Sequence, residues 1–315
     1  MNFLYQERNS FRNKNLCIIF FSILLFFNFL NPIFAENKVS YEVDRNRDIH
    51  LQCGLEKIIS ELELFESAKK GDVAISLVDI SSISKPKFAG INSMQMVYSA
   101  SLPKIAILYA ALKKAEQGKL EWNDEIQAMA EAMIQHSANQ EATELYYIVG
   151  PDYINTLLKS DKCALYSASN GGGIWVGKEY GPGEAWEREE VCTLSHAANP
   201  IQVARFYYLL ETGELLSSPW SRKAKLILSG TGLRHKFIAG LDYCCPGAEF
   251  YRKSGSWGSY HSDSALIKYD GYEYILVGLI NHPKGDQMLR NLTIETNKLI
   301  KTYEDNDAIC RPYFE

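Results

Sequence analysis

The sequence has no excess of positive charge and no metal-binding cysteine pattern. Its 315 residues carry 33 Lys and Arg against 38 Asp and Glu, a net charge of −5, with no long basic run after the N-terminal segment. Nucleic-acid binding therefore has little support. There is no CxxC pair and no Cys/His spacing of a zinc site, so neither a metal nor another cofactor is expected.

Internal repeats and low-complexity linkers are also missing, and a composition of 46% hydrophobic and 23% charged residues is typical of a folded globular chain. Six cysteines follow residue 35, and an even number in an exported chain suggests disulfide bonds, with free buried thiols as the alternative. Their pairing is open, but the adjacent Cys244 and Cys245 are expected to bond elsewhere rather than to each other. The six are Cys53, Cys163, Cys192, Cys244, Cys245 and Cys310.

The first 35 residues have the pattern of a secretory signal peptide. Arg8, Arg12 and Lys14 precede the apolar run "CIIFFSILLFFNF", and Ala35 offers a small residue before the cut. An uncleaved membrane anchor is the alternative, because the apolar run is long for a signal. We expect residues 36–315 to form a single catalytic domain, periplasmic or secreted, free of the membrane after cleavage.

Apolar periodicity predicts strands near both ends of the chain and helices between them. Residues 161–195, rich in glycine and aromatics, are expected to form one long loop. The strands are predicted at 72–80, 86–93, 248–257, 261–269 and 273–282, and the helices at 51–67, from 101, 124–135, 139–149, 150–160, 199–213, 218–230 and 286–303.

The expected fold class is α/β, of the α+β kind, with two lobes. One antiparallel sheet, built from both chain ends and flanked by helices, would occupy about residues 50–98 and 234–305. An all-α lobe would occupy about residues 99–233. The active site would lie in the crevice between the lobes.

Ser101 and Lys104 open a helix whose residues "IAILYAAL" are apolar on every face, which indicates burial all round. A serine at a helix N-terminus sits where developing negative charge is favoured. A buried lysine one turn on would have a lowered pKa and could act as a base. The alternative is a capped helix with a surface lysine, and a bare S-x-x-K pattern occurs three times more in the chain.

Two further motifs strengthen the catalytic interpretation. Ser137-Ala138-Asn139 is the only S-x-N in the chain and falls between two predicted helices. Lys253-Ser254-Gly255 is the only K-[ST]-G and falls on a predicted strand, where glycine allows a close approach to the backbone.

In this order, the three motifs resemble those of the penicillin-recognising serine enzymes, the β-lactamases and penicillin-binding D,D-peptidases. The likeness is greatest to class A β-lactamases and covers about residues 50–305. It implies that Ser101 is the acylated nucleophile, Lys104 a base or proton relay, and Ser137 the group that passes a proton to the leaving nitrogen. The backbone N–H groups of Ser101 and Ser256 would form the oxyanion hole.

The resemblance also implies a substrate-binding set. Asn139 would bind the substrate amide, and Lys253 would attract a substrate carboxylate that Ser254 hydrogen-bonds. Gly255 would let the substrate approach the strand. Together these groups supply nucleophile, base, acid and oxyanion donors, as acyl transfer requires.

The sequence departs from the class A pattern at three places. The middle motif reads S-A-N rather than S-D-N, and Ser137 follows Ser101 by only 36 positions. Residues 161–195 also lack the E-x-x-L-N segment whose glutamate activates the deacylating water in class A enzymes. Glu184 is retained as a candidate for that role, although each glutamate of the loop could be a solvated surface acid; the others are Glu179, Glu187, Glu189 and Glu190.

The leading hypothesis is an exported monomeric serine hydrolase acting on β-lactams or a related amide, with weak deacylation. A D,D-peptidase acting on acyl-D-Ala-D-Ala peptides is a second reading. A penicillin-binding sensor that forms a stable acyl adduct is a third. In each case the partner is a small molecule.

Overall fold

The computed structural model describes residues 46–160, 162–305 and 312–314, which belong to one compact unit, Tyr41–Glu315. The signal segment expected at residues 1–35 lies outside the described residues. None of the helices in the described ranges has both the length and the apolar character needed to cross a bilayer.

A five-stranded antiparallel sheet lies at the centre of this unit, with the strand order β2-β1-β10-β9-β8. In its register, Val73 lies opposite Ile280 and Lys253 opposite Ser264. Strands from both chain ends therefore share one sheet, as predicted, and β8 is an edge strand. Their bounds are β1 Val73–Asp79, β2 Lys87–Ile91, β8 Glu249–Trp257, β9 Tyr260–Tyr269 and β10 Tyr272–Asn281.

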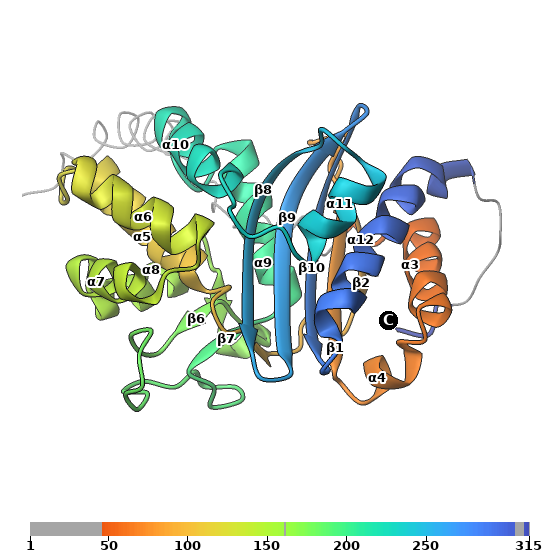
Figure 1. The fold of residues 1–315 in the computed structure, drawn as a ribbon, viewed down its shortest axis with the longest axis horizontal. Helices are drawn as coiled ribbons and strands as arrows, with labels where there is room; N and C mark the ends of the chain where they lie inside the picture. Colours follow the sequence, from red (N-terminus) through yellow and green to blue (C-terminus); the bar gives the residue numbers. More distant parts are fainter. Residues whose placement is uncertain (1–45, 161, 306–311, 315) are drawn as a thin grey trace, which may run out of the picture. The chain divides into compact units, whose positions relative to one another are not determined.

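Helices cover both faces of the sheet, because its strands carry apolar residues on both sides. In β1, Val73, Ile75 and Leu77 join one hydrophobic core, while Ala74 and Val78 join the other. The first core is covered by α3, α11 and α12, which Figure 1 shows together beside the strands. These helices, with the short α4, are α3 Ile49–Glu61, α4 Phe65–Lys69, α11 Phe237–Cys244 and α12 Gly285–Thr302.

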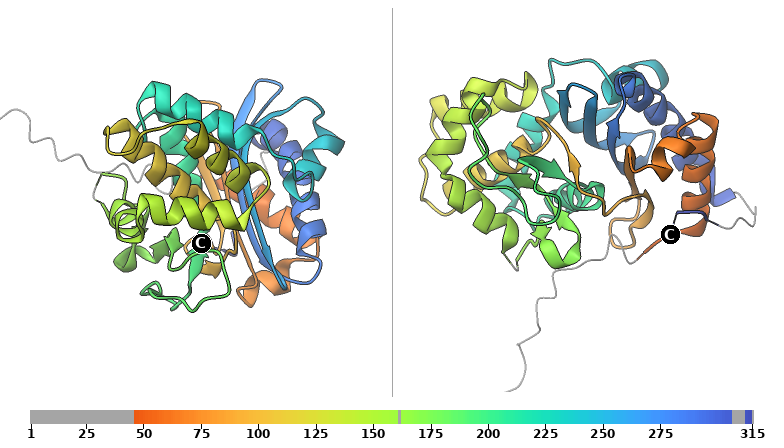
Figure 2. Two further views of the ribbon diagram at one scale, coloured as in Figure 1. Left: turned by 60° about the vertical axis from the view of Figure 1, so that its left-hand side comes forward. Right: turned by 90° about the horizontal axis from the view of Figure 1, so that it is seen from below.

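The second core joins the sheet to a mainly helical lobe, seen from two further directions in Figure 2. The lobe is not all-α as expected, because short strands between residues 166 and 198 lie within it. Its central helix, α5, is buried along the whole run Ile105–Leu112, as the apolar pattern predicts. The predicted middle helices are all present. They are α5 Lys104–Glu116, α6 Asp124–Gln135, α7 Asn139–Val149, α8 Pro151–Lys159, α9 Pro200–Thr212 and α10 Ser218–Ser229.

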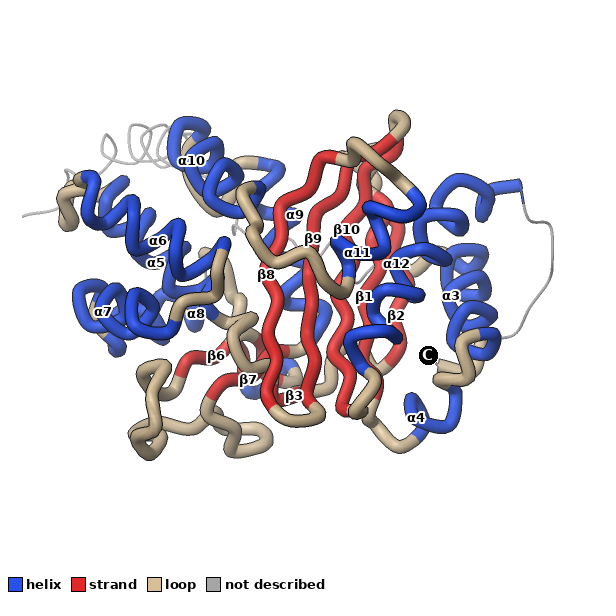
Figure 3. Tube along the Cα trace, in the orientation of Figure 1, coloured by secondary structure: helices blue, strands red, loops and turns tan. Residues whose placement is uncertain are grey.

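Three local predictions differ from the structure. The helix expected over 51–67 is interrupted after Glu61, where Glu63 takes a positive φ of 57°. Helix α11 was not expected. The segment 161–195, shown with its neighbours in Figure 3, contains short strands rather than one continuous loop. The short elements are β3 Val97–Tyr98, β4 Tyr166–Ser167, β5 Gly172–Gly173, β6 Trp175–Val176, β7 His196–Ala198, and the 3₁₀ turns Ala168–Asn170 and Tyr303–Asp305.

The cysteine expectations need correction. Cys244 and Cys245 are bonded to each other, contrary to the expectation for adjacent cysteines. They lie at the end of α11, where the chain turns toward β8. Cys163 is a buried free thiol and Cys192 an exposed one. An even cysteine count therefore did not predict which cysteines pair.

Candidate active site

Ser101 lies in the tight turn that leads from β3 into α5. The helix itself begins at Lys104, and Pro103 caps it with φ of −64°, a value that proline fixes in advance. Ala100 has a positive φ of 51°, a strained conformation for a residue with a side chain. The turn presents the half-buried Ser101 to a cavity of about 600 Å³.

Lys104 is completely buried and faces the loop between α6 and α7. Its Nζ lies 2.7 Å from the Ser137 carbonyl oxygen, 3.1 Å from that of Ala138 and 2.7 Å from Asn139 Oδ1. Burial lowers the pKa of Lys104 to about 7, although the carboxylate of Glu141 acts in the opposite direction. Within the described residues, no hydrogen bond joins Ser101 Oγ to Lys104 Nζ. Such contacts are often long in a ligand-free enzyme.

The S-x-N and K-S-G motifs meet in front of this helix. Lys253 Nζ donates to Ser137 Oγ over 3.0 Å and to the Ser254 carbonyl over 2.6 Å. Ser137 has a positive φ of 58°. The loop therefore holds this residue in an unusual backbone conformation, which fixes the position of its hydroxyl. Asn139 is the first residue of α7 and lines the cavity together with Ser101.

Gly255 is needed because β8 passes directly against the Ser101 turn. A Cβ atom placed on Gly255 would lie 2.4 Å from the Ser99 carbonyl oxygen and 2.6 Å from the Ser101 nitrogen. Both neighbours are backbone atoms, which cannot rotate aside. Ser262 Oγ from β9 also donates to the Ser99 carbonyl over 2.8 Å, so the turn and the strands form one packed unit.

The sequence did not indicate Lys236, a second buried lysine behind β8. It precedes α11 with φ of 52° and ψ of −119°, a strained backbone for a non-glycine residue. Its Nζ donates to the Gly255 carbonyl over 2.5 Å and to Ser256 Oγ over 2.7 Å. No motif marks this position, because the Lys236 side chain reaches β8 only when α11 packs on the sheet.

The buried lysines give the site unusual electrostatics. Burial lowers the pKa of Lys236 to about 8. For Lys253, burial and then the neighbouring Lys104 hold the pKa well below its ordinary value of 10.5. The carboxylate of Asp263, in β9, acts in the opposite direction and raises the pKa of Lys253. Asp263 also pairs with the buried Arg252, with 2.7 Å between Arg252 Nε and Asp263 Oδ1. An amine whose pKa lies near 7, as that of Lys104 does, is suited to move protons.

The segment after β6 contributes an aromatic wall that the sequence also did not reveal. The Tyr180 ring stacks on His196 with ring centroids 4.3 Å apart. Lys104 Nζ lies over the face of the Tyr180 ring, 4.4 Å from the ring centroid. Burial, followed by the charges of Lys178 and Lys104, lowers the pKa of His196 to about 4, so the imidazole is neutral. Within the described residues, neither the Tyr180 hydroxyl nor His196 Nδ1 has a hydrogen-bond partner.

The glutamates of residues 161–195 do not reach the cavity. The Glu184 side chain is 99% exposed and its nearest ion-pair partner is Arg188, at 3.9 Å. Its selection as a deacylation base is therefore not supported by its position. Glu189 is buried, but its carboxylate accepts hydrogen bonds from the backbone of Val191, Cys192 and Leu194, which closes its own turn.

The described residues that line the cavity include no carboxylate. They come from the Ser101 turn, α7, the segment after β6, β7 and the end of β8. They are Tyr98, Ala100, Ser101, Asn139, Lys178, Tyr180, Gly181, Pro182, Ser195, His196, Ser256 and Trp257. No group of three or more His, Cys, Asp or Glu among the described residues is placed to hold a metal ion.

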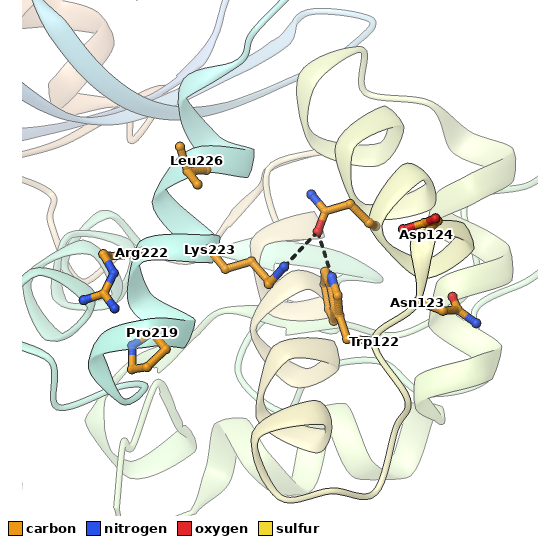
Figure 4. A pocket seen from close by; sticks show the side chains of 8 residues that line it. Trp122, Asn123, Asp124, Pro219, Arg222, Lys223 and Leu226 are labelled. Carbon is orange, nitrogen blue, oxygen red and sulfur yellow. Dashed lines mark hydrogen bonds between the residues drawn. The ribbon is translucent and has the colours of Figure 1, made fainter.

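A second cavity, of about 450 Å³, lies between α10 and the start of α6 (Figure 4). Gln127 Oε1 accepts hydrogen bonds there from Trp122 Nε1 over 2.7 Å and from Lys223 Nζ over 3.3 Å. It shares no residue with the Ser101 cavity and contains none of the three motifs. We therefore assign the candidate chemistry to the first cavity alone.

Solved structures share this arrangement of sheet and helices, and they define its fold as that of class A β-lactamases. The structure of PBP-A matches with a TM-score of 0.62 and 16% identity, over 81% of this chain and 97% of that one. A β-lactamase from Sphaerobacter thermophilus DSM 20745 matches with a TM-score of 0.63 and 15% identity, over 79% and 97%. An ancestral class A β-lactamase matches with 0.60 and 15%, over 78% and 99%.

Residues 54–300 match the model of the β-lactamase enzyme family. This stretch is most of the chain and contains all three motifs. The chain therefore belongs to that family, within the penicillin-recognising serine hydrolases. A comparison with curated protein sequences gives no match.

Proposed function

We propose that this protein is an exported serine hydrolase that is acylated at Ser101 by β-lactams or by a related amide, and that it releases the acyl group slowly. The observation that carries the proposal is the meeting of three motifs around Lys104, a fully buried lysine whose pKa lies at about 7. A neutral amine beside a serine supplies the base that an alcohol nucleophile needs.

The acylation step uses the groups around the cavity. Ser101 Oγ attacks the carbonyl carbon while its proton passes to the lone pair of neutral Lys104. The backbone N–H groups of Ser101 and Ser256 stabilise the oxyanion. Ser137, hydrogen-bonded to Lys253, then gives its proton to the leaving nitrogen as the C–N bond breaks, and it takes a proton back from the ammonium of Lys104. The serine ester remains on the enzyme.

A carboxylate on the leaving side of the substrate would lie along β8. Ser254 would hydrogen-bond it, while Lys253 and Lys236 supply positive charge from behind the strand. Lys236 contacts Ser256 Oγ directly, so binding of an anion beside it would raise the pKa of its amine. Asn139 would bind the amide of the acyl side, since it lines the cavity next to Ser101.

Slow deacylation is supported by the absence of a carboxylate among the described cavity residues. This feature favours the second candidate, a D,D-peptidase or a penicillin-binding sensor on the same scaffold. A mutant of PBP-A, a protein with a similar fold, was solved as an acyl-enzyme complex with penicillin G. Export is supported by the signal pattern of residues 1–35.

The proposal is tested by mass spectrometry of the protein mixed with benzylpenicillin and followed over time. We expect one covalent adduct, on the peptide containing Ser101, which persists while little hydrolysed drug accumulates. An adduct that disappears as product accumulates would make the protein an efficient β-lactamase. Absence of any adduct, with acyl-D-Ala-D-Ala peptides as well as with the drug, would contradict acylation at Ser101.

Replacing Tyr180 by alanine is expected to speed deacylation by about tenfold or more, because general-base catalysis of water attack is worth at least that much. The ring now covers one side of Lys104. Removing it would admit water beside an amine that can take a proton. The measurement is the decay rate of the benzylpenicillin adduct.

Tyr180→Phe is the matched control. It keeps the ring and removes only a hydroxyl that has no hydrogen-bond partner among the described residues, so the adduct should decay as slowly as in the native protein. Faster decay in Tyr180→Phe would show that the hydroxyl, rather than the space filled by the ring, controls the lifetime of the adduct.

A further inference from the structure

The wall of the Ser101 cavity carries a cationic side chain, Lys178, although the protein as a whole is acidic. The net charge is −5, yet the ionisable side chains among the described lining residues are Lys178, His196, Tyr98 and Tyr180, and none of them is a carboxylic acid. Lys253 and Lys236 are already assigned to a carboxylate on the leaving side of the substrate. Lys178 is not used by that assignment.

Lys178 lies on a different part of the wall from β8. It follows β6 and lines the cavity with Tyr180 and Pro182, whereas β8 contributes Ser256 and Trp257. Its charge reaches the interior of the site, because it is the second cause, after burial, of the lowered pKa of His196. Ser101 lines the same cavity, so one ligand can extend from β8 past Ser101 toward Lys178.

Lys178 has no acidic partner among the described residues. Its Nζ donates to the Gly183 carbonyl, within the same loop, and it is part of no ion pair there. It is half-buried and lines the cavity together with Tyr180 and His196. A neutral ligand that filled the cavity would remove water from this cation without replacing the lost solvation. An anionic group would replace it.

We propose that Lys178 binds a carboxylate on the acyl side of the substrate, so that the preferred acyl donor carries an anionic group on each side of the bond that Ser101 attacks. This inference rests on the proposed function and adds the substrate class to it. The acyl-side carboxylate would approach over the aromatic wall of Tyr180, and Lys178 would hold it through a charge-assisted hydrogen bond.

The test uses benzylpenicillin and carbenicillin, which differ by one carboxylate on the acyl side chain. The rate constant for acylation of Ser101 by each drug is measured by mass spectrometry in the native protein and in Lys178→Gln. The glutamine amide can still donate to the Gly183 carbonyl, so this variant removes the charge and keeps the loop contact. Lys57→Gln, at an exposed lysine of α3, is the control for loss of one positive charge.

We expect Lys178→Gln to slow acylation by carbenicillin about tenfold, the effect of one charge-assisted contact. Benzylpenicillin should change by less than about twofold, as should both drugs in Lys57→Gln. The carbenicillin rate of the native protein should also fall with added salt, and this dependence should be weaker in Lys178→Gln.

Three other outcomes would overturn the inference. If both drugs acylate Ser101 and Lys178→Gln changes neither rate, Lys178 does not bind the acyl-side carboxylate, and the proposed function stands without it. If neither drug forms an adduct with the native protein, the inference fails together with the proposed function. An equal loss with both drugs would also contradict it, since it would assign Lys178 a role in loop structure alone.

Discussion

Replacing Ser101 by alanine is expected to abolish the covalent adduct with benzylpenicillin. The proposed reaction needs an oxygen nucleophile at this position, and the other polar groups of the cavity can only bind the drug or move protons. Removing a half-buried hydroxyl from a turn should change the stability of the fold little. The measurement is intact-protein mass spectrometry after incubation with excess drug, together with a thermal unfolding curve.

The matched control for this variant is Ser195→Ala. Ser195 lines the same cavity. Its backbone carbonyl, rather than its hydroxyl, accepts a hydrogen bond from the Gly177 N–H. The adduct should therefore form at close to the native rate. If the Ser101→Ala protein were still acylated, the nucleophile would have to be another residue, and Ser137 would be the first to examine.

Replacing Lys104 by arginine or glutamine is expected to slow acylation by about 10²- to 10⁴-fold, the usual contribution of a positioned base. Arginine keeps the positive charge but stays protonated at neutral pH. Glutamine keeps hydrogen-bonding capacity without charge. Loss in both variants would identify proton acceptance as the role of Lys104, whereas native activity in Lys104→Arg would mean that only its charge is needed.

The pH dependence of acylation provides a second test of Lys104 as the base. Because burial lowers the pKa of Lys104 to about 7, acylation should increase with pH and reach half its plateau near pH 7. The carboxylate of Glu141 raises the pKa of Lys104, so Glu141→Gln should move the midpoint to lower pH. A rate that does not change between pH 5 and about pH 9 would contradict a base with this pKa.

The motif residues were predictable from sequence because each motif is short and its chemistry is local. Ser101 and Lys104 are three residues apart at the start of α5, and Gly255 is required by a backbone contact that its motif anticipates. The sheet was predictable for a similar reason, since β-rich runs at both ends of the chain need partners. Burial of α5 followed directly from its apolar residues.

The residues that sequence reasoning missed have roles that arise only from tertiary contacts. Lys236 reaches β8 because α11 packs on the sheet, and nothing in "LRHKFIAG" indicates this. Tyr180 and His196 are 16 positions apart in a region without periodicity, yet their rings stack. Glu184 illustrates the opposite error, because proximity in sequence to a functional loop does not determine where a side chain points.

The contact between Gly255 and the Ser101 turn has a consequence for how such a protein can evolve. Gly255 cannot accept a larger residue without moving the backbone that carries the nucleophile, so this position of β8 should tolerate almost no substitution. The opposite wall of the cavity, formed by the segment after β6, is held by side-chain contacts, such as that of Thr143, whose hydroxyl accepts a hydrogen bond from the Tyr180 backbone N–H over 3.0 Å. Changes in substrate range should therefore accumulate in residues 178–187, while the catalytic half stays constant and new specificities arise without rebuilding the chemistry.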